Sequence, residues 1–534
     1  MSTDDTTNQP DGTSLAGMFR HAPSMLDRWL AVATDKRWTV VLRDGAETRT
    51  IGPEEIERLF DPGKSEGRHA DSHADLSAVR RDRVWLALRR GQPLPDDVAK
   101  RLDRAGVVLK PVDDRARRKR RRGVVHRELP KEITAVVDAF TQFRVTGPGA
   151  DRLDVVRLVD LINGRRTTCS DTDTGTIGRY EPNRPAWSAG DLATFVNGFF
   201  TASHSKWLNH SKWLNHSKWL NHSKWLGDPA FDFTTMTPPP TAPVDATGLK
   251  IGIVDTGVQT VGPGGTPHPW FPASIVSGEP DALAPTDVAY AHGTTTTGIV
   301  RRGAPTVPIQ VEAIAMSASN FLVEETECWD AVVALIAGGC DYLNLSFGGA
   351  GVGCFRPLYL LIDAFDRMMQ GSRHPWPYVF AAAGNLDGHD PSHPDDHNEV
   401  ITPAAWDNVW AVAGGDPATD RADLDTRRPY YSWSNGGGWV DELLMIHDRG
   451  LGALVYADED DGHTDHHHGH DHPQLPDDEL ILVSTGPMEV DPDDPTAGEQ
   501  PLIALVIGTS ALAPLALARH ASGQRSNAHQ QGLV

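Results

Sequence analysis

The chain has 534 residues, of which 39% are hydrophobic, and its 50 basic and 72 acidic residues give a formal net charge of −22 at pH 7. This length is too great for one ordinary domain and suits two or three. The acidic excess argues against a nucleic-acid-binding surface across the whole protein.

Three further features bear on the compartment. Residues 1–7 are acidic and polar, without a basic and then an apolar stretch, so we expect no secretory signal. No window reaches the roughly 18 apolar residues of a membrane span, so no membrane association is expected. The four cysteines (Cys169, Cys328, Cys340 and Cys354) fit neither a disulfide framework nor a zinc pattern. We therefore expect reduced, structural cysteines and a cytoplasmic protein.

The chain begins with a segment predicted to be disordered, residues 1–15, and a small domain, residues 16–113. Short apolar runs and helical stretches alternate in this domain, which predicts a β-α-β-like unit of the α+β class. Residues 114–130 follow and contain a basic run at 115–122. Charge runs are usually solvated, so we predict a linker; a processing site and an anionic docking patch are the alternatives.

Helical spacing marks the next segment. Apolar residues recur at helical intervals over 131–143, 151–163 and 189–200, so residues 131–203 are predicted to be a helical region. The apolar face of the middle stretch is broad, which is typical of a core helix rather than of a binding face.

A tandem repeat then fills residues 204–227. The motif His-Ser-Lys-Trp-Leu-Asn begins at His204 and recurs every six residues, with the fourth copy ending in Gly227. On a helix this period spreads the tryptophans over three faces, and on a strand neither face is polar. With the Pro-rich stretch that follows, residues 204–245 are predicted to be a tolerant linker; a partner-binding aromatic ladder is the alternative.

From residue 246 the pattern changes to short, continuous apolar runs separated by Gly-rich turns and helical stretches. The runs lie at 251–254, 309–314, 342–345, 379–383 and 409–413. Such runs are typical of buried parallel strands, so residues 246–534 are predicted to form an α/β domain with a parallel sheet. The functional residues of such a domain are expected at strand ends.

Three short motifs in this domain carry chemistry. Asp255 ends the run Ile-Gly-Ile-Val-Asp-Thr-Gly, His292 opens His-Gly-Thr, and Ser510 lies in Gly-Thr-Ser-Ala, shortly before Pro514. Acyl transfer by a serine needs a base, an acid that orients the base, and donors for the oxyanion. We predict Ser510 as the nucleophile, His292 as the base and Asp255 as the orienting acid. Their order, Asp then His then Ser, distinguishes between unrelated folds that carry such a triad.

These motifs and their order resemble the subtilisin-like serine proteases, the subtilase family S8. Two further segments share the resemblance, which covers about residues 248–520. The run Asn-Leu-Ser-Phe-Gly-Gly resembles the family segment whose backbone pairs with substrate, which implies substrate-binding roles for Ser346, Phe347 and Gly348. The run 380–385 resembles the strand that ends in the oxyanion asparagine, which implies that role for Asn385.

The resemblance also implies a three-layer, subtilisin-like fold and protein or peptide substrates. Family members often bind calcium, but its ligands cannot be placed here; the chemistry requires no cofactor. An acidic and His-rich stretch at about 447–480 reads as an insertion, with six histidines between 463 and 472. We predict a solvated surface loop rather than a specific metal site, because a metal site needs fixed geometry.

Two functions remain open at this point. The leading hypothesis is a serine endopeptidase that hydrolyses peptide bonds through an acyl-enzyme. The alternative is a catalytically silent subtilase-fold protein used for binding or scaffolding; a complete triad with an oxyanion asparagine favours the enzyme. Every catalytic motif lies after residue 248. We therefore expect the N-terminal half to restrain or direct the protease, and residues 38–112 are a candidate inhibitory domain with the basic run as its cut site.

Overall fold

The computed structural model covers most of the predicted domains. It describes residues 25–44, 47–60, 76–112, 128–150, 152–164, 192–201, 238–239, 248–280, 291–314, 322–350, 355–385, 401–415, 434, 440–444, 453–455, 480–490, 498–506 and 508–523. The predictions for residues 1–15, the basic run 115–122, the repeat 204–227 and the histidines of 463–472 lie outside these residues and stay predictions.

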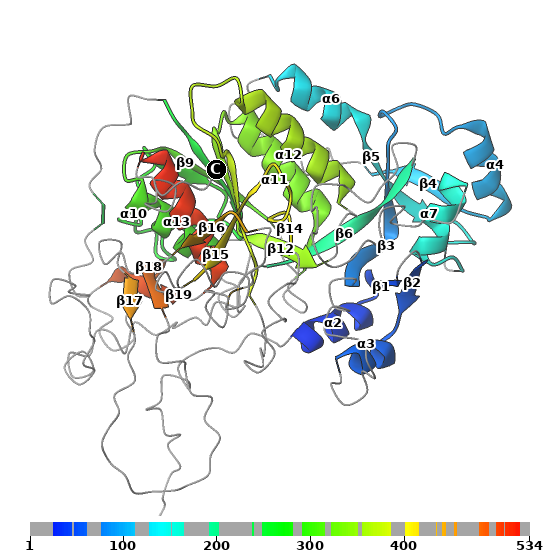
Figure 1. Cartoon of the computed structure of the whole chain (residues 1–534), viewed down its shortest axis with the longest axis horizontal. Helices are drawn as coiled ribbons and strands as arrows, with labels where there is room; N and C mark the ends of the chain where they lie inside the picture. Colours follow the sequence, from blue (N-terminus) through cyan, green and yellow to red (C-terminus); the bar gives the residue numbers. More distant parts are fainter. Residues whose placement is uncertain are drawn as a thin grey trace, which may run out of the picture.

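The half of the chain predicted to be a peptidase, residues 246–534, is called the peptidase half below and is built on a seven-stranded parallel sheet. Its strands are, in spatial order, β16 (Glu442–Leu444), β15 (Trp410–Gly414), β13 (Val379–Ala382), β11 (Tyr342–Leu345), β7 (Ile251–Asp255), β9 (Ile309–Ala313) and β8 (Val276–Gly278). The helices α10 (His292–Gly303) and α13 (Thr509–Ala521) cover one face, and α11 (Glu325–Ala337) and α12 (Arg356–Met369) cover the other (Figure 1). The predicted three-layer α/β fold is confirmed, and each predicted apolar run overlaps a strand.

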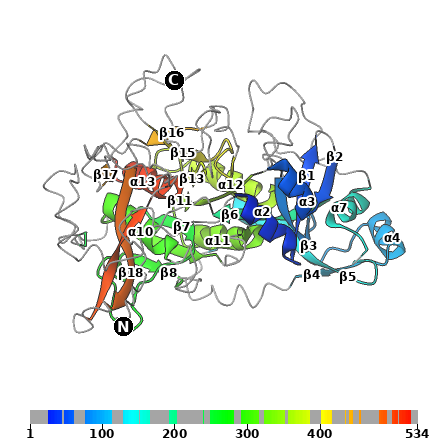
Figure 2. The same ribbon diagram turned by 90° about the horizontal axis from the view of Figure 1, so that it is seen from below.

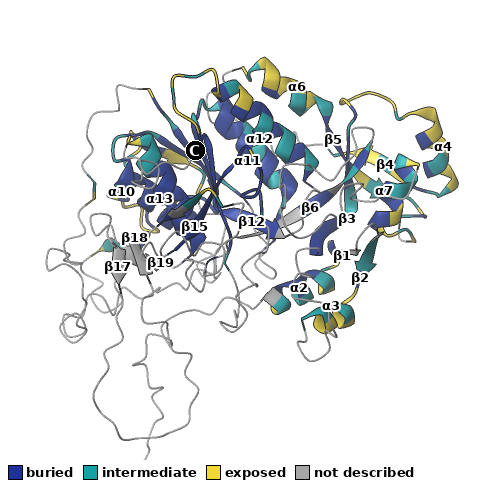
Figure 3. Ribbon diagram, viewed as in Figure 1, coloured by how far each residue is buried: buried dark blue, intermediate teal, exposed yellow. Residues whose placement is uncertain are grey.

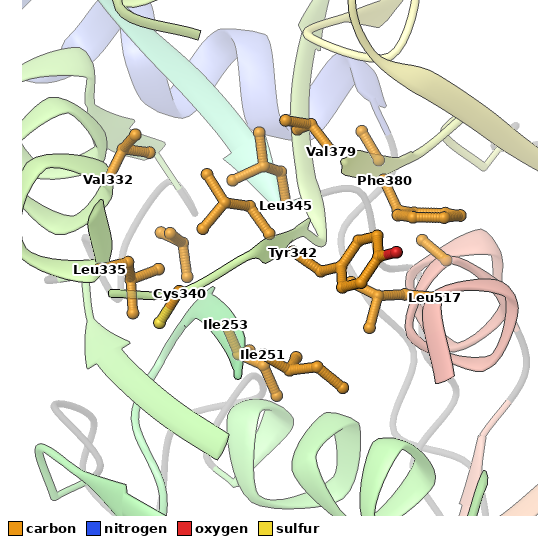
Figure 4. Close-up of a cluster of buried hydrophobic side chains, with 14 of the residues drawn as sticks. Ile251, Ile253, Val332, Leu335, Cys340, Tyr342, Leu345, Val379, Phe380 and Leu517 are labelled. Carbon is orange, nitrogen blue, oxygen red and sulfur yellow. The ribbon is translucent and has the colours of Figure 1, made fainter. Parts of the chain in front are cut away.

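Apolar residues on both faces of the sheet explain these layers. In Figure 4, Val332 and Leu335 from α11 and Leu517 from α13 approach the strands from opposite sides. Gly252 in β7 allows the close approach of α11, because a Cβ there would lie 2.9 Å from Leu335. Figure 3 shows that burial is concentrated in this half, whereas α4 and α6 of the N-terminal half expose much of their surface. The continuous apolar runs of the sequence are thus the centre of the core.

The N-terminal half forms one α+β unit. Its elements are α2 (Met25–Thr34), β1 (Trp38–Asp44), β2 (Glu47–Ile51), α3 (Pro53–Leu59), β3 (Leu76–Leu86), α4 (Asp96–Arg104), β4 (Val108–Pro111), α6 (Lys131–Ala139), β5 (Thr141–Thr146), α7 (Val155–Asn163) and β6 (Ala193–Thr201). Strand β3 is central, since it pairs antiparallel with β1, β5 and β6. The unit therefore has a single sheet.

Two predictions for this half are wrong. Residues 131–203 are not a helical region, because β5 and β6 are strands; the helix predicted over 189–200 is β6. Thr194 and Val196 are β-branched and suit a strand, and the pairing with β3 decides the conformation. Residues 16–113 are not a separate domain either, since β5 pairs with both β3 and β4.

One sheet joins the two halves of the chain. Strand β6 pairs antiparallel with β10 (Leu322–Glu324) and with β12 (Phe347–Ala350), both from the peptidase half (Figure 1). Strand β12 pairs in turn with β14 (Ile401–Thr402). The N-terminal unit thus contributes a strand to the surface of the peptidase half.

A second small sheet lies at the other end of the molecule. Strands β17 (Ala453–Val455), β18 (Leu480–Val490) and β19 (Glu499–Val506) pair antiparallel. Figure 2 shows the β18–β19 hairpin and the N-terminal unit on opposite sides of the central helices. Because β17 lies within 447–480, that insertion is not a loop throughout; its short apolar run pairs with β18. In the part of the chain that the structure describes, no helix combines the length and apolarity of a membrane span.

Candidate active site

The predicted site residues gather at the carboxyl edge of the parallel sheet. Asp255 is the last residue of β7, and Asn385 follows β13 after two residues. His292 is the first residue of α10 and Ser510 the second of α13. This edge is where α/β sheets generally carry their ligands.

A hydrogen-bond chain links the three residues predicted as a triad. His292 Nδ1 lies 2.6 Å from Asp255 Oδ1, and His292 Nε2 lies 3.1 Å from Ser510 Oγ. All three side chains are buried, with 4%, 2% and 0% of Asp255, His292 and Ser510 exposed. A proton on Nδ1 donates to the carboxylate and leaves the Nε2 lone pair to accept from the serine hydroxyl. Residues that are 37 and 218 positions apart in the sequence thus meet as predicted.

Thr256 and Gly293 fix the Asp–His pair. The Thr256 amide donates to Asp255 Oδ1 at 2.7 Å, and the Gly293 amide donates to Thr256 Oγ1 at 3.0 Å. A Cβ at position 293 would lie 2.2 Å from the carbonyl oxygen of Gly257, so only glycine lets α10 approach this strand end. Sequence reasoning assigned no role to Thr256, although it lies inside the Asp motif.

Gly508 and Thr509 set the turn into Ser510. Gly508 has φ +138°, a conformation that favours glycine, and a Cβ there would lie 3.0 Å from Asn385 Nδ2. The amide of Thr509 donates to Asn385 Oδ1 at 2.8 Å, and its hydroxyl lies 3.1 Å from the same oxygen. Because Oδ1 is held by α13, the Asn385 amide nitrogen faces the turn beside Ser510. Thr509 is a contributor that sequence reasoning missed, although it belongs to the Gly-Thr-Ser motif.

The segment predicted to bind substrate is paired with the N-terminal unit. Phe347 and Gly348 open β12, and their register partners in β6 are Thr201 and Phe200. Phe200 also pairs with Leu322 of β10, so β6 lies between two strands of the peptidase half. Ser346, directly before β12, donates its hydroxyl to the carbonyl oxygen of Ser510 at 2.9 Å. Sequence reasoning missed β6, because its pairing partners are distant in the sequence.

Ion pairs near β6 anchor the N-terminal unit to the peptidase half. Glu324, at the end of β10, forms ion pairs with Arg80 (2.6 Å) and Arg83 (2.7 Å) of β3. The adjacent Glu325 is fully buried and accepts hydrogen bonds from Asn197 of β6. Burial raises the pKa of Glu325 to about 8, with a further contribution from the neighbouring Glu324 charge.

No metal centre emerges from the residues that the structure describes, since they hold no group of three or more His, Cys, Asp or Glu arranged for a metal ion. Calcium ligands therefore cannot be assigned among them. Of the cysteines, Cys328 and Cys340 are buried.

Comparison with known proteins gives a family match for part of the chain. Residues 246–438 match the model of the subtilase family, Peptidase_S8. Ser510 lies beyond the matched segment, but the fold brings its hydroxyl to His292, which lies within that segment. No match was found among curated proteins.

Several solved structures resemble the chain at low identity. A lanthipeptide protease is 17% identical over 53% of this chain and 76% of its own, with a TM-score of 0.33. A cold adapted subtilisin-like serine proteinase is 17% identical over 55% and 80%, with a TM-score of 0.29. Fervidolysin from Fervidobacterium pennivorans, a keratinolytic enzyme related to subtilisin, is 13% identical over 82% and 54%, with a TM-score of 0.37. These scores carry no conclusion about activity. By its family match, the segment 246–438 belongs to the subtilase family of serine proteases.

Proposed function

We propose that the protein is a serine endopeptidase that hydrolyses peptide bonds through an acyl-enzyme. The observation that supports this most strongly is the buried hydrogen-bond chain from Asp255 through His292 to Ser510. In this arrangement the imidazole accepts the hydroxyl proton at Nε2 while the carboxylate stabilises the charge that develops on the ring.

The reaction then has two halves. Ser510 Oγ attacks the carbonyl carbon as its proton moves to His292 Nε2. The tetrahedral intermediate collapses when Nε2 returns that proton to the leaving amine, and the acyl group stays on Oγ. Water attacks the ester by the reverse sequence and releases the carboxylic acid. The negative charge on the intermediate needs a donor near Ser510, and Asn385 Nδ2 is the side-chain donor nearest to the turn at Gly508.

We also propose that β6 restrains this activity. An extended substrate that pairs with β12 needs the backbone groups of Phe347 and Gly348, which already pair with β6. Substrate and β6 therefore exclude each other on this edge. The N-terminal unit supplies the strand, which supports its role as a restraint.

Hydrolysis of an unstructured protein tests the proposal. The purified chain is incubated with reduced casein, and new termini are identified by mass spectrometry. We expect cleavage by the wild type and none by Ser510→Ala. Ser277→Ala is the matched control, because that hydroxyl donates to Ile309 at the far edge of the sheet and should leave cleavage unchanged. Equal cleavage by Ser510→Ala would overturn the proposal. A folded wild type and a folded Glu324→Gln that neither cleave nor react with a serine-directed probe would favour the scaffold alternative.

A further inference from the structure

Helix α13 contains a proline at a position that affects the nucleophile. In an α-helix, the amide of residue i donates to the carbonyl oxygen of residue i−4. Pro514 lies inside α13 and has no amide hydrogen, so it cannot donate to the carbonyl oxygen of Ser510. The peptide unit that carries the nucleophile therefore lacks the helical hydrogen bond that another residue at 514 would supply.

Ser346 provides a replacement from another element. Its hydroxyl donates to the Ser510 carbonyl oxygen at 2.9 Å, and the Asn344 side-chain amide donates to the Ser346 oxygen at 2.8 Å. Ser346, Asn344 and Ser510 are 3%, 0% and 0% exposed. A hydroxyl has one proton, so by accepting from Asn344 the Ser346 group is oriented to donate to Ser510.

We propose that Ser346 is a positioning residue for the nucleophile, and that its hydroxyl supplies the hydrogen bond that Pro514 removes from α13. The role is distinct from substrate binding by β12, because it uses the side chain and points to the peptide unit of Ser510. Fixing that unit keeps Ser510 Oγ within 3.1 Å of His292 Nε2. Small displacements of reacting groups are costly in rate.

A double-mutant cycle between positions 346 and 514 tests the inference, which rests on the proposed function only for its kinetic readout. In the full chain, Ser346→Ala should lower the rate of Ser510 labelling by a fluorophosphonate about tenfold. In a Pro514→Ala background, the restored amide makes the hydroxyl redundant, and the same change should cost less than about threefold. A substrate-binding or β6-pairing role for Ser346 would not depend on residue 514.

Two further comparisons keep the result interpretable. Ser346→Thr retains the hydroxyl and should label nearly as fast as wild type. Ser346→Val has the shape of the threonine variant without the hydroxyl, so it should behave like Ser346→Ala. Ser484→Ala is the matched control: that buried serine also donates to a backbone carbonyl, Thr295 at 2.8 Å, and its loss should leave labelling unchanged. The thermal midpoints of all variants are measured in parallel, in chains that also carry Ser510→Ala. This change removes the nucleophile but keeps the main-chain carbonyl oxygen that accepts the hydrogen bond from Ser346.

The outcomes distinguish the positioning role of Ser346 from the proposed function as a protease. Coupling between 346 and 514 in both labelling and stability supports the inference. Coupling in stability with no labelling of any folded variant leaves the hydrogen-bond replacement standing and overturns the proposed function. Labelling that occurs without coupling, or coupling confined to stability while labelling is unaffected, overturns the positioning role.

Discussion

Asp255, His292 and Ser510 owe their geometry to neighbours with small or hydroxyl-bearing side chains. Thr256 connects the end of β7 to the start of α10 through its hydroxyl. Thr509 connects the Asn385 side chain to the start of α13. Because these contacts are made by residues adjacent to the site residues in the sequence, the local motifs largely determine the orientation of the site.

Loss of the Asn385 side chain should slow the reaction strongly. We expect Asn385→Ala to lower the turnover of a peptide ester by about 10²–10³-fold, because one donor to the developing oxyanion is removed. Asn163→Ala is the control, since that side chain accepts from Leu192 and Ala193 amides in the N-terminal unit. Turnover of Asn385→Ala at the wild-type rate would exclude Asn385 as the donor.

His268 should make the protein sensitive to acid. Its Nδ1 accepts from the Trp270 amide, and its Nε2 lies 3.0 Å from the Gly486 carbonyl oxygen in the hairpin. Burial lowers the pKa of His268 to about 4, so the folded protein holds the ring neutral. Stability from this group is complete above pH 6.5, the unfolded value, and falls as the pH decreases towards 4, by up to about 3 kcal/mol.

Thermal unfolding from pH 4 to pH 8 measures this effect. His268→Gln keeps a donor for Gly486 and has no titration in this range, so its stability should depend less on pH than that of the wild type. Identical pH profiles for the two proteins would show that His268 is not the acid-sensitive group.

At the scale of elements, α10 shows how packing overrides propensity. Its four threonines, Thr294–Thr297, lower intrinsic helix propensity. All four are buried, and the Thr297 hydroxyl donates to the Gly293 carbonyl oxygen at 2.6 Å. Contacts with α13, β18 and the sheet compensate for the cost.

The contact between α10 and β18 depends on a glycine. A Cβ at Gly298 would lie 2.4 Å from Ser484 Oγ and 2.8 Å from Thr485 Cγ2. Gly298→Ala should therefore destabilise the protein by about 1–3 kcal/mol, despite the better helix propensity of alanine. Gly371→Ala is the control, because the nearest atom to its Cβ would be 3.9 Å away. Chemical denaturation measures both, and a Gly298→Ala protein as stable as wild type would contradict the tight contact.

The sequence was most informative where structure is local. The strands of the parallel sheet appear as continuous apolar runs, and the site residues follow directly from their motifs. Strand β6 was misread because Ala193, Val196 and Phe200 recur at helical intervals, while the strands that pair with it lie as far away as β3 and β12. Pairing between distant segments leaves no periodic signal in the sequence.

At the scale of the whole molecule, an ion-pair cluster connects the two halves. Arg80 and Arg83 of the N-terminal unit meet Glu324, whose side chain is 11% exposed. Removing one partner of a buried pair leaves an uncompensated charge, so this contact should hold β6 beside β12.

Weakening the cluster should activate the peptidase. We expect Glu324→Gln to raise the rate of casein cleavage on the order of tenfold or more, because β6 then leaves the β12 edge more often. Glu55→Gln is the control, since it breaks the Arg49–Glu55 pair inside the N-terminal unit. Faster casein cleavage in both variants, or in neither, would contradict a specific role for Glu324.

Glu325 should make the docking of the N-terminal unit on the peptidase half depend on pH. Because burial raises its pKa to about 8, the docked state holds a proton that an exposed carboxyl loses near 4.5. Docking is therefore fully favoured below pH 4.5 and weakens as the pH rises through 8. The charge of Glu324 raises this pKa further, and Asn197 donates hydrogen bonds to the Glu325 carboxyl group.

The rate of casein cleavage from pH 7 to pH 9 reports this release. We expect a steeper rise in wild type than in Glu325→Gln, which is neutral at every pH. Parallel pH profiles for the two proteins would show that Glu325 does not control docking.

The central claim is that Ser510 is a nucleophile activated by His292. It is tested most directly by treating the full chain with a fluorophosphonate and locating the adduct by peptide mass spectrometry. The adduct is expected on Ser510 in the wild type, with none in folded His292→Ala. Labelling of Ser510 at equal rates in both proteins, or no adduct in either folded wild type or folded Glu324→Gln, would contradict it.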